Sequence, residues 1–217
     1  MTEAPTPNGD RADGAIEPGA AGAVAPAGTD GDPRSRPRFM PRLRTLLEWV
    51  AVLAVALVVA IVVRTYVIQT YYIPSISMEP TLLVGDHILV LKAAYRFTSP
   101  AIGDVVVFKA PPQEHNACQD PQVQDLVKRI IALPGDTIRS SGNTIYVDGK
   151  VLAQPWQHTA QIGSAIRNQL VPANHYFVMG DNRPESCDSR VWGTVPRTDV
   201  IGKAVLIFWP PSRLSII

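Results

Sequence analysis

The residues best suited to chemistry are two serines, Ser75 and Ser77, in the segment IPSISMEPTL (73–82). The prolines around them do not suit the interior of a strand or helix, and paired hydroxyls in such a setting usually mark a turn. A serine hydroxyl can also be a nucleophile, but only when a neighbouring base takes its proton. The choice between a turn and a nucleophile therefore depends on finding a base.

The histidines do not supply an obvious base. None of them lies in a recognisable triad motif, and the chain has no Gly-x-Ser-x-Gly nucleophile elbow. A lone histidine in a β domain is more often a surface residue or a satisfied core residue. We therefore do not expect a triad built on His87, His115, His158 or His175.

Lys128 is the unusual lysine, because it is embedded in the apolar run LVKRIIALPGD. Strand alternation would place Lys128 and Arg129 on opposite, largely apolar faces. Burial lowers a lysine pKa, and a value of about 7–8 would let Lys128 act as a base. Arg129 cannot be neutralised in this way, so we expect it to face solvent. Residue type and spacing alone favour a simpler interpretation, in which Lys128 extends along a strand edge and has no catalytic role.

A third polar segment, MGDNRPESCDSRVWG (179–193), follows an apolar run. Its composition alone indicates a polar turn that contains an Asp188–Arg190 pair. The segment lacks the spacing and the closing glutamate of an EF-hand loop, so it is a poor calcium site. We expect no metal ion here.

A long apolar segment precedes the two serines. From Trp49 to Val63 there is no charged or polar residue. As a helix, residues 46–63 would extend about 27 Å, close to the roughly 30 Å hydrocarbon core of a bilayer. We predict a transmembrane helix at 45–66; a buried core helix and an uncleaved signal-like segment are the alternatives.

The flanking residues predict the topology of this span. An arginine cluster without an acid lies just before it, so the positive-inside rule places the N-terminus in the cytoplasm and the C-terminal domain outside. Residues 1–37 are rich in Ala, Gly and Pro. They cannot bury enough apolar surface to offset the entropy lost when a chain becomes ordered. We therefore predict a disordered cytoplasmic tail with an Arg-rich juxtamembrane segment at 1–44, the span at 45–66, and an extracytoplasmic domain at 67–217.

The C-terminal domain is predicted to be mostly β. Short β-branched runs bounded by Gly, Asp or Pro predict strands, and Asp148-Gly149 is typical of a hairpin turn. The apolar stretch that ends at Trp209 is broken by prolines, so we expect a core strand followed by a tail. The predicted strands are 86–92, 104–110, 126–133, 143–152, 175–180 and 200–209.

Composition restricts the partners and the redox chemistry. The formal net charge of +1 argues against nucleic-acid binding through a general basic surface. The chain has 2 cysteines, too few for a disulfide-dense scaffold or a four-cysteine zinc site. Outside the cytoplasm Cys118 and Cys187 are permitted to pair, but two free thiols fit the sequence equally well.

Taken together, these segments resemble the bacterial type I signal peptidases (leader peptidases), which are membrane-bound Ser-Lys endopeptidases. IPSISMEPTL is similar to the family's nucleophile box, VKRIIALPGD to its lysine box and GDNRPESCDSRVWG to its C-terminal box, while GDHILVLK and GDVVVFKAP look like the intervening strand box. The resemblance covers residues 45–210. Three boxes in this order after a membrane span are highly specific.

The resemblance implies a role for each matching residue. Ser77 is the expected nucleophile and Lys128 the general base, with the Ser75 hydroxyl and the Ser77 N–H as oxyanion hole. Ser186 is expected to orient the lysine amine by a hydrogen bond. The expected structural residues are Gly180, Asp181, Asn182, Asp188 and Arg190, and the expected pocket residues are Ile73, Pro74 and Val127.

The resemblance also implies an antiparallel β-sheet catalytic domain that cleaves signal peptides from secretory preproteins after Ala-x-Ala-like sites, without a cofactor. The expected location is the plasma membrane, with the lipid bilayer and the secretion translocon as candidate partners. The short insertion between Pro134 and His175 indicates a reduced accessory β subdomain, as in Gram-positive or actinobacterial single-span forms. Pro184-Glu185 and Cys187 depart from the family pattern, which often has polar residues and a small residue there.

Two other functions compete with this one. A membrane-tethered binding or adaptor protein could keep the fold without activity, but the intact Ser77, Lys128 and Ser186 argue against it. A Ser-Lys protease that cleaves itself, as in the self-cleaving SOS repressors, would need a DNA-binding helical domain. Here a tail and a span stand in that place.

Overall fold

The computed structural model describes residues 40–118, 124–157 and 161–217. The predicted disorder of the N-terminal tail falls mainly on residues outside these ranges. The first element is α1 (Met40–Tyr66), which begins a few residues earlier than the predicted helix. Its segment Arg42–Tyr66 has a mean hydropathy of 2.9, and none of its most apolar window is buried. By length and composition, α1 is a candidate membrane span.

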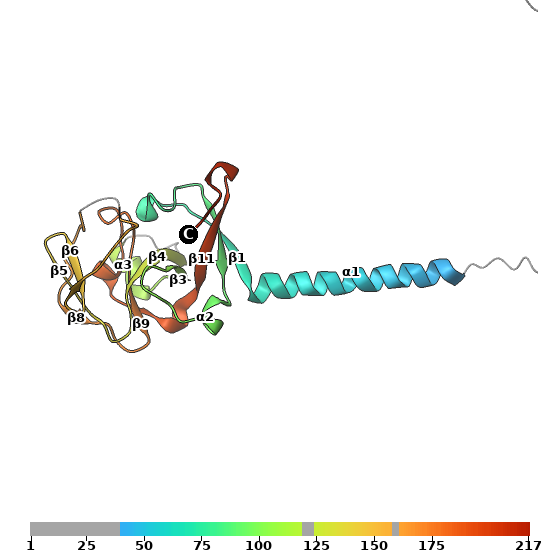
Figure 1. Ribbon diagram of the computed structural model, residues 1–217, viewed down its shortest axis with the longest axis horizontal. Helices are drawn as coiled ribbons and strands as arrows, with labels where there is room; N and C mark the ends of the chain where they lie inside the picture. The colour runs from blue at the N-terminus through green and yellow to red at the C-terminus, as the bar shows by residue number, and fades with distance from the viewer. Residues whose placement is uncertain (1–39, 119–123, 158–160) are drawn as a thin grey trace, which may run out of the picture. The chain divides into compact units, whose positions relative to one another are not determined.

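The larger sheet has eight strands and holds the candidate site (Figure 1). Its strand order is β1-β2-β11-β3-β4-β9-β10, with β12 paired to β11, and every pairing is antiparallel. The predicted antiparallel β architecture is therefore confirmed. The strands are β1 (Ile68–Tyr72), β2 (His87–Leu91), β3 (Val105–Lys109), β4 (Asp125–Ala132), β9 (His175–Met179), β10 (Val195–Pro196), β11 (Val200–Trp209) and β12 (Ser215–Ile216).

The smaller sheet is the predicted reduced accessory subdomain. It has four short strands in the order β7-β6-β5-β8, namely β5 (Thr137–Ser141), β6 (Thr144–Val147), β7 (Lys150–Val151) and β8 (Gln169–Leu170). Figure 1 shows β5, β6 and β8 grouped at one side of the domain. The hairpin between β6 and β7 turns at Asp148 (φ 50°) and Gly149 (φ 75°), as predicted, because positive φ at both positions suits an Asp-Gly turn.

The helical elements after α1 are all short. They are η1 (Ile76–Met78), α2 (Ala94–Phe97), α3 (Pro112–Ala117), α4 (Ser189–Trp192), η2 (Arg197–Asp199) and η3 (Pro211–Arg213). The expectation of a plain tail after Trp209 was wrong: η3 reverses the chain, and β12 pairs back onto β11.

The packing of the core explains why β3 and β4 are nearly continuous apolar segments in the sequence. Val105 and Val107 pack into a cluster with Leu82, while Val106 and Phe108 on the opposite face pack with Trp192. Both faces of β3 are thus covered, so alternation with polar residues is absent. The central strands are thereby held rigidly, and β4 carries the predicted lysine.

Candidate active site

The Ser75–Ser77 segment leaves β1 and turns at once into η1. Ile73 is buried, and its backbone is fixed by hydrogen bonds from Ile73 N to Asp86 O and from Gly85 N to Ile73 O, both 2.9 Å. Met78, at the end of η1, is buried in the core. The segment is therefore a turn, as its prolines indicated, and the two apolar anchors fix Ser77 between them.

Lys128 meets Ser77 in this turn. Lys128 Nζ lies 2.6 Å from Ser77 Oγ, and the two residues are 3% and 8% exposed. Lys128 pairs with Val106 on β3, in a strand flanked by β3 and β9. The interpretation of Lys128 as an exposed strand-edge lysine was therefore wrong. Its side chain is enclosed and directed at the hydroxyl.

Burial lowers the pKa of Lys128 to about 8. The carboxylates of Asp188 and Glu114 act in the opposite direction and offset only part of this effect. When charged, Nζ donates the hydrogen bond to Ser77 Oγ; when neutral, its lone pair can accept the Ser77 proton. The neutral form is accessible at mildly alkaline pH, which is what a general base requires.

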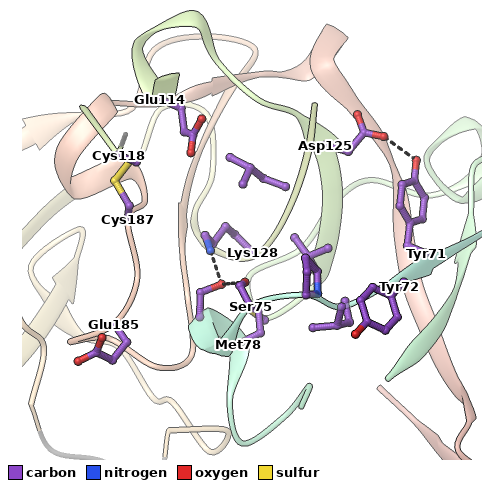
Figure 2. Close-up of a pocket in the computed structure, with 15 residues that line it drawn as sticks. Tyr71, Tyr72, Ser75, Met78, Glu114, Cys118, Asp125, Lys128, Glu185 and Cys187 are labelled. Atoms are coloured by element: carbon purple, nitrogen blue, oxygen red, sulfur yellow. Dashed lines mark hydrogen bonds between the residues drawn. A yellow bond between two sulfur atoms is a disulfide. The ribbon is translucent and has the colours of Figure 1, made fainter. Parts of the chain in front are cut away.

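Ser75 lies beside the nucleophile candidate. Its Oγ is 3.2 Å from Ser77 Oγ, and the residue is exposed. In Figure 2 the dashed lines from Lys128 and from Ser75 meet at one oxygen, which is Ser77 Oγ. A Ser75 hydroxyl in this position can donate to an oxygen that develops charge next to Ser77.

Arg129, the neighbour of Lys128, corrects another prediction. It does not face solvent: it is 7% exposed and forms a bidentate ion pair with Asp181, Nε to Oδ1 at 2.8 Å and Nη2 to Oδ2 at 2.6 Å. Its Nη1 donates to Gly103 O at 2.6 Å, and its guanidinium lies over the Trp156 ring. A buried arginine is tolerable when a carboxylate pairs with it and its other donors are satisfied.

Asp181 also connects this ion pair to the Ser75–Ser77 segment. Thr81 Oγ1 donates to Asp181 Oδ2 at 2.5 Å. The next residue, Asn182, donates from its backbone N to Ser77 O and from Nδ2 to Ile76 O, both at 3.1 Å. The loop after β9 thus holds η1 against β4 at several points.

Asp188 and Arg190 form the predicted pair. Arg190 Nε and Nη2 each donate to an Asp188 carboxylate oxygen at 2.7 Å, and Asp188 is fully buried. Asp188 also accepts from the backbone N–H of Gly180 at 3.0 Å and from Arg190 N, as the N-cap of α4. Arg190 Nη2 further donates to Arg183 O and Ser186 O. The pair therefore fixes the backbone around Ser186.

Ser186 packs against Gly180 rather than pairing with the lysine. Its Oγ is buried and has no hydrogen-bond partner among the residues that the structure describes. A Cβ at Gly180 would lie 2.3 Å from Ser186 Oγ and 2.4 Å from Ser77 O. The predicted hydrogen bond from Ser186 to Lys128 is thus not formed here, and its orienting role stays a prediction.

A cavity of about 310 Å³ opens beside Ser77 and Lys128. Its lining includes the three predicted pocket residues, Ile73, Pro74 and Val127. Sequence reasoning missed the rest of the wall, which comes from Tyr71, Tyr72, Met78, Glu114, Asp125, Leu126 and Glu185. Met78 and Glu185 lie within the serine box and the C-terminal box, and the other residues except Glu114 lie next to the serine or lysine box. Glu114 had no such sequence signal.

A disulfide between Cys118 and Cys187 forms part of the same wall. It joins the end of α3 to the residue between Ser186 and Asp188. The sequence left open whether these cysteines pair or are free thiols, and in the structure they are paired. In Figure 2 the disulfide and Glu114 lie on one side of Lys128, while Asp125 and Tyr71 lie on the other. Tyr71 OH donates to Asp125 Oδ2 at 3.1 Å, which fixes that side of the cavity.

Comparisons with known proteins show that similar sequences are signal peptidases. The sequence profile described as signal peptidase, peptidase S26, matches residues 46–209. Signal peptidase I of Leptolyngbya laminosa is 39% identical over 78% of this chain and 83% of the relative. Signal peptidase I of Mycobacterium tuberculosis is 36% identical over 90% and 84%.

Among solved structures, a signal peptidase I from Enterococcus faecalis is 28% identical, with a TM-score of 0.39 over 49% of this chain and 97% of that one. The profile match extends over most of the chain and includes both Ser77 and Lys128. The chain therefore belongs to the signal peptidase family, peptidase S26.

Proposed function

We propose that this protein is a membrane-bound serine endopeptidase that removes signal peptides from secretory preproteins with a Ser77–Lys128 dyad. One observation carries the proposal: a buried lysine amine with a lowered pKa lies 2.6 Å from a buried serine hydroxyl. A serine needs a base to become a nucleophile, and no other base is within hydrogen-bond distance of Ser77 among the described residues.

The reaction begins with neutral Lys128. Its lone pair takes the Ser77 proton as Oγ attacks the carbonyl carbon of the scissile bond. The leaving amine then takes a proton from the lysine, and the acyl-enzyme is hydrolysed by water that Lys128 activates in the same way. Ser186 is the candidate for orienting the amine, because its hydroxyl is buried and uncommitted in the loop that Asp188 and Arg190 fix.

The oxyanion of the tetrahedral intermediate would accept hydrogen bonds from the Ser77 backbone N–H and the Ser75 hydroxyl. The 3.2 Å separation of the two serine hydroxyls supports this assignment. Loss of one such donor typically costs about 2.7–4 kcal/mol in transition-state stabilisation. Ser75→Ala should therefore lower kcat by roughly 100- to 1000-fold.

The cavity wall supports the proposed substrate preference. Ile73, Pro74 and Val127 line the space beside Ser77 with apolar surface. Apolar surface gains free energy by covering apolar side chains, so this part of the wall suits apolar residues of a substrate. The lining therefore supports cleavage after Ala-x-Ala-like sites, as the family resemblance implies.

The proposed location is the plasma membrane, with α1 as a single span. The arginine cluster before the span favours a cytoplasmic N-terminus, which puts the catalytic domain outside. A preprotein held in the bilayer by its own signal sequence would then present its cleavage site on the same side. The secretion translocon is a candidate partner because it delivers such preproteins.

The test is cleavage of a purified Ala-x-Ala preprotein by the full chain in detergent or proteoliposomes, with sequencing of the product's new N-terminus. Ser77→Ala and Lys128→Ala should each reduce cleavage by at least about a thousandfold. The matched controls are Ser141→Ala and Lys150→Ala, which change exposed residues of the smaller sheet. Retained cleavage in either dyad variant, or a product cut elsewhere, would refute the proposal.

A further inference from the structure

A second cavity, of about 180 Å³, lies between α2 and the start of β11. We call it the basic pocket, and its charged lining consists of Lys92, Arg96 and Arg197. The remaining wall contains Tyr95, Pro100, Tyr176 and Val200. It shares no residue with the cavity at Ser77 and has no part in the proposed reaction.

The positive charge of the basic pocket is not compensated. No carboxylate lines it, and none of its three cations forms an ion pair within the described part of the chain. Asp104 accepts a hydrogen bond from Tyr95 OH, but its charge is paired with Lys203 at 2.6 Å. The pocket is therefore electrostatically suited to an anion.

The arginine at the rim of the pocket is held in place. Arg197 Nη1 donates to Tyr176 OH at 3.2 Å, and Nη2 donates to Tyr95 O at 3.3 Å. A guanidinium carries five N–H donors, so several stay available for a ligand. Planar guanidinium groups of this kind are well suited to phosphate oxygens.

The pocket lies where the chain leaves α1. Lys92 Nζ donates to Thr65 O at 2.8 Å, and Lys92 N donates to Val67 O at 2.8 Å. Thr65 is at the end of the candidate span, which finishes at Tyr66. If that span crosses the bilayer, its terminal carbonyls are at headgroup level, because the headgroup layer borders the roughly 30 Å hydrocarbon core.

We propose that the basic pocket binds the phosphate of an anionic phospholipid headgroup. Lys92, Arg96 and Arg197 provide the positive charge. The position of the pocket beside Thr65 places it within reach of lipid headgroups. The assignment depends on α1 being a membrane span and is independent of the proposed peptidase function. A free phosphate ion shares this chemistry, so the experiment has to separate the two sources.

The test is native mass spectrometry of the full chain in neutral detergent micelles, titrated with phosphatidylglycerol or with phosphatidylcholine. Wild-type protein should retain phosphatidylglycerol preferentially. Arg96→Gln/Arg197→Gln should weaken that binding by roughly 30-fold, since each cation near an anionic lipid contributes about a fivefold gain in affinity. Lys150→Gln/Arg167→Gln removes the same charge from exposed positions and should bind as wild type does.

Two results would overturn the proposal. One is equal phosphatidylglycerol retention by wild type and by Arg96→Gln/Arg197→Gln, with both proteins showing the same thermal unfolding. The other is displacement of the lipid by millimolar inorganic phosphate, which would assign the pocket to a soluble anion. Preprotein cleavage is not part of the readout, so failure here leaves the proposed function unaffected.

Discussion

Gly180 approaches the carbonyl oxygen of Ser77 so closely that a Cβ at position 180 would lie 2.4 Å from it. The same Cβ would lie 2.3 Å from Ser186 Oγ. The backbone of the Ser75–Ser77 segment is thus packed directly against the backbone of the loop after β9. No rotation of a side chain could relieve such a contact on the Ser77 side.

We therefore expect Gly180→Ala to displace η1 from Lys128 and to abolish preprotein cleavage. The measurement is kcat/KM, together with the melting temperature of the full chain in detergent. Gly142→Ala is the matched control, because Gly142 lies in the β5–β6 hairpin with open space around it. Its φ of 56° costs an alanine about 1–2 kcal/mol, and its activity should persist. Wild-type activity in Gly180→Ala would show that the close packing is not required.

The two residues of the buried Arg129–Asp181 ion pair should be strongly coupled in their contributions to the free energy of unfolding. Arg129→Met or Asp181→Leu alone leaves an uncompensated buried charge and should cost about 3–5 kcal/mol of unfolding free energy. The double variant removes both charges, so it should be considerably more stable than the sum of the single losses predicts. A double-mutant cycle by denaturant unfolding checks this, and additive losses would contradict the coupling.

The Cys118–Cys187 disulfide should stabilise the domain, because it closes a loop with a sequence separation of 69. Cys118→Ala/Cys187→Ala should lower the free energy of unfolding by roughly 2–5 kcal/mol. A dithiol reductant should destabilise the wild type to the same level and leave the double variant unchanged. Thermal unfolding with and without reductant measures both effects, and an unaffected wild type would count against the bridge.

Lys128 should make stability depend on pH in a defined direction. Its folded pKa, about 8, lies below the unfolded value of 10.5, so the folded state releases the proton first. The burial penalty, roughly 3 kcal/mol, is fully present below pH 8 and fades as pH rises towards 10.5. Lys128→Met should be more stable than wild type at pH 7, and the difference should shrink by pH 10.

Lys150→Met is the control for this comparison, because it makes the same substitution at an exposed lysine. Denaturant unfolding at the two pH values measures the difference. A stability gap between Lys128→Met and wild type that does not change with pH would contradict the titration.

Much of the fold could be predicted from sequence periodicity. β3 and β11 lie in long β-branched runs, and the Asp148-Gly149 dipeptide supplies the positive φ values of a hairpin. β1 and β5 were not predicted, because IQTYY and TIRSS mix polar and apolar residues in short segments. Their strand identity depends on pairing with β2 and β6, which local sequence does not contain.

The site was less accessible to local reasoning. Lys128 is enclosed only because β4 is an interior strand, and sheet order is a long-range property. The error about Arg129 has the same origin, since its partner Asp181 lies 52 residues away. The resemblance to a family linked the serine, lysine and C-terminal boxes, which the fold brings together in space. Composition and spacing alone favoured a turn and a lysine at a strand edge.

The most direct test of the account is the pH dependence of kcat/KM for preprotein cleavage by the wild-type chain. If neutral Lys128 is the base, kcat/KM should rise with pH and reach half its maximum near pH 8, the pKa to which burial lowers this amine. An acidic optimum, or a profile with no rise between pH 7 and 9, would contradict a lysine base at Ser77.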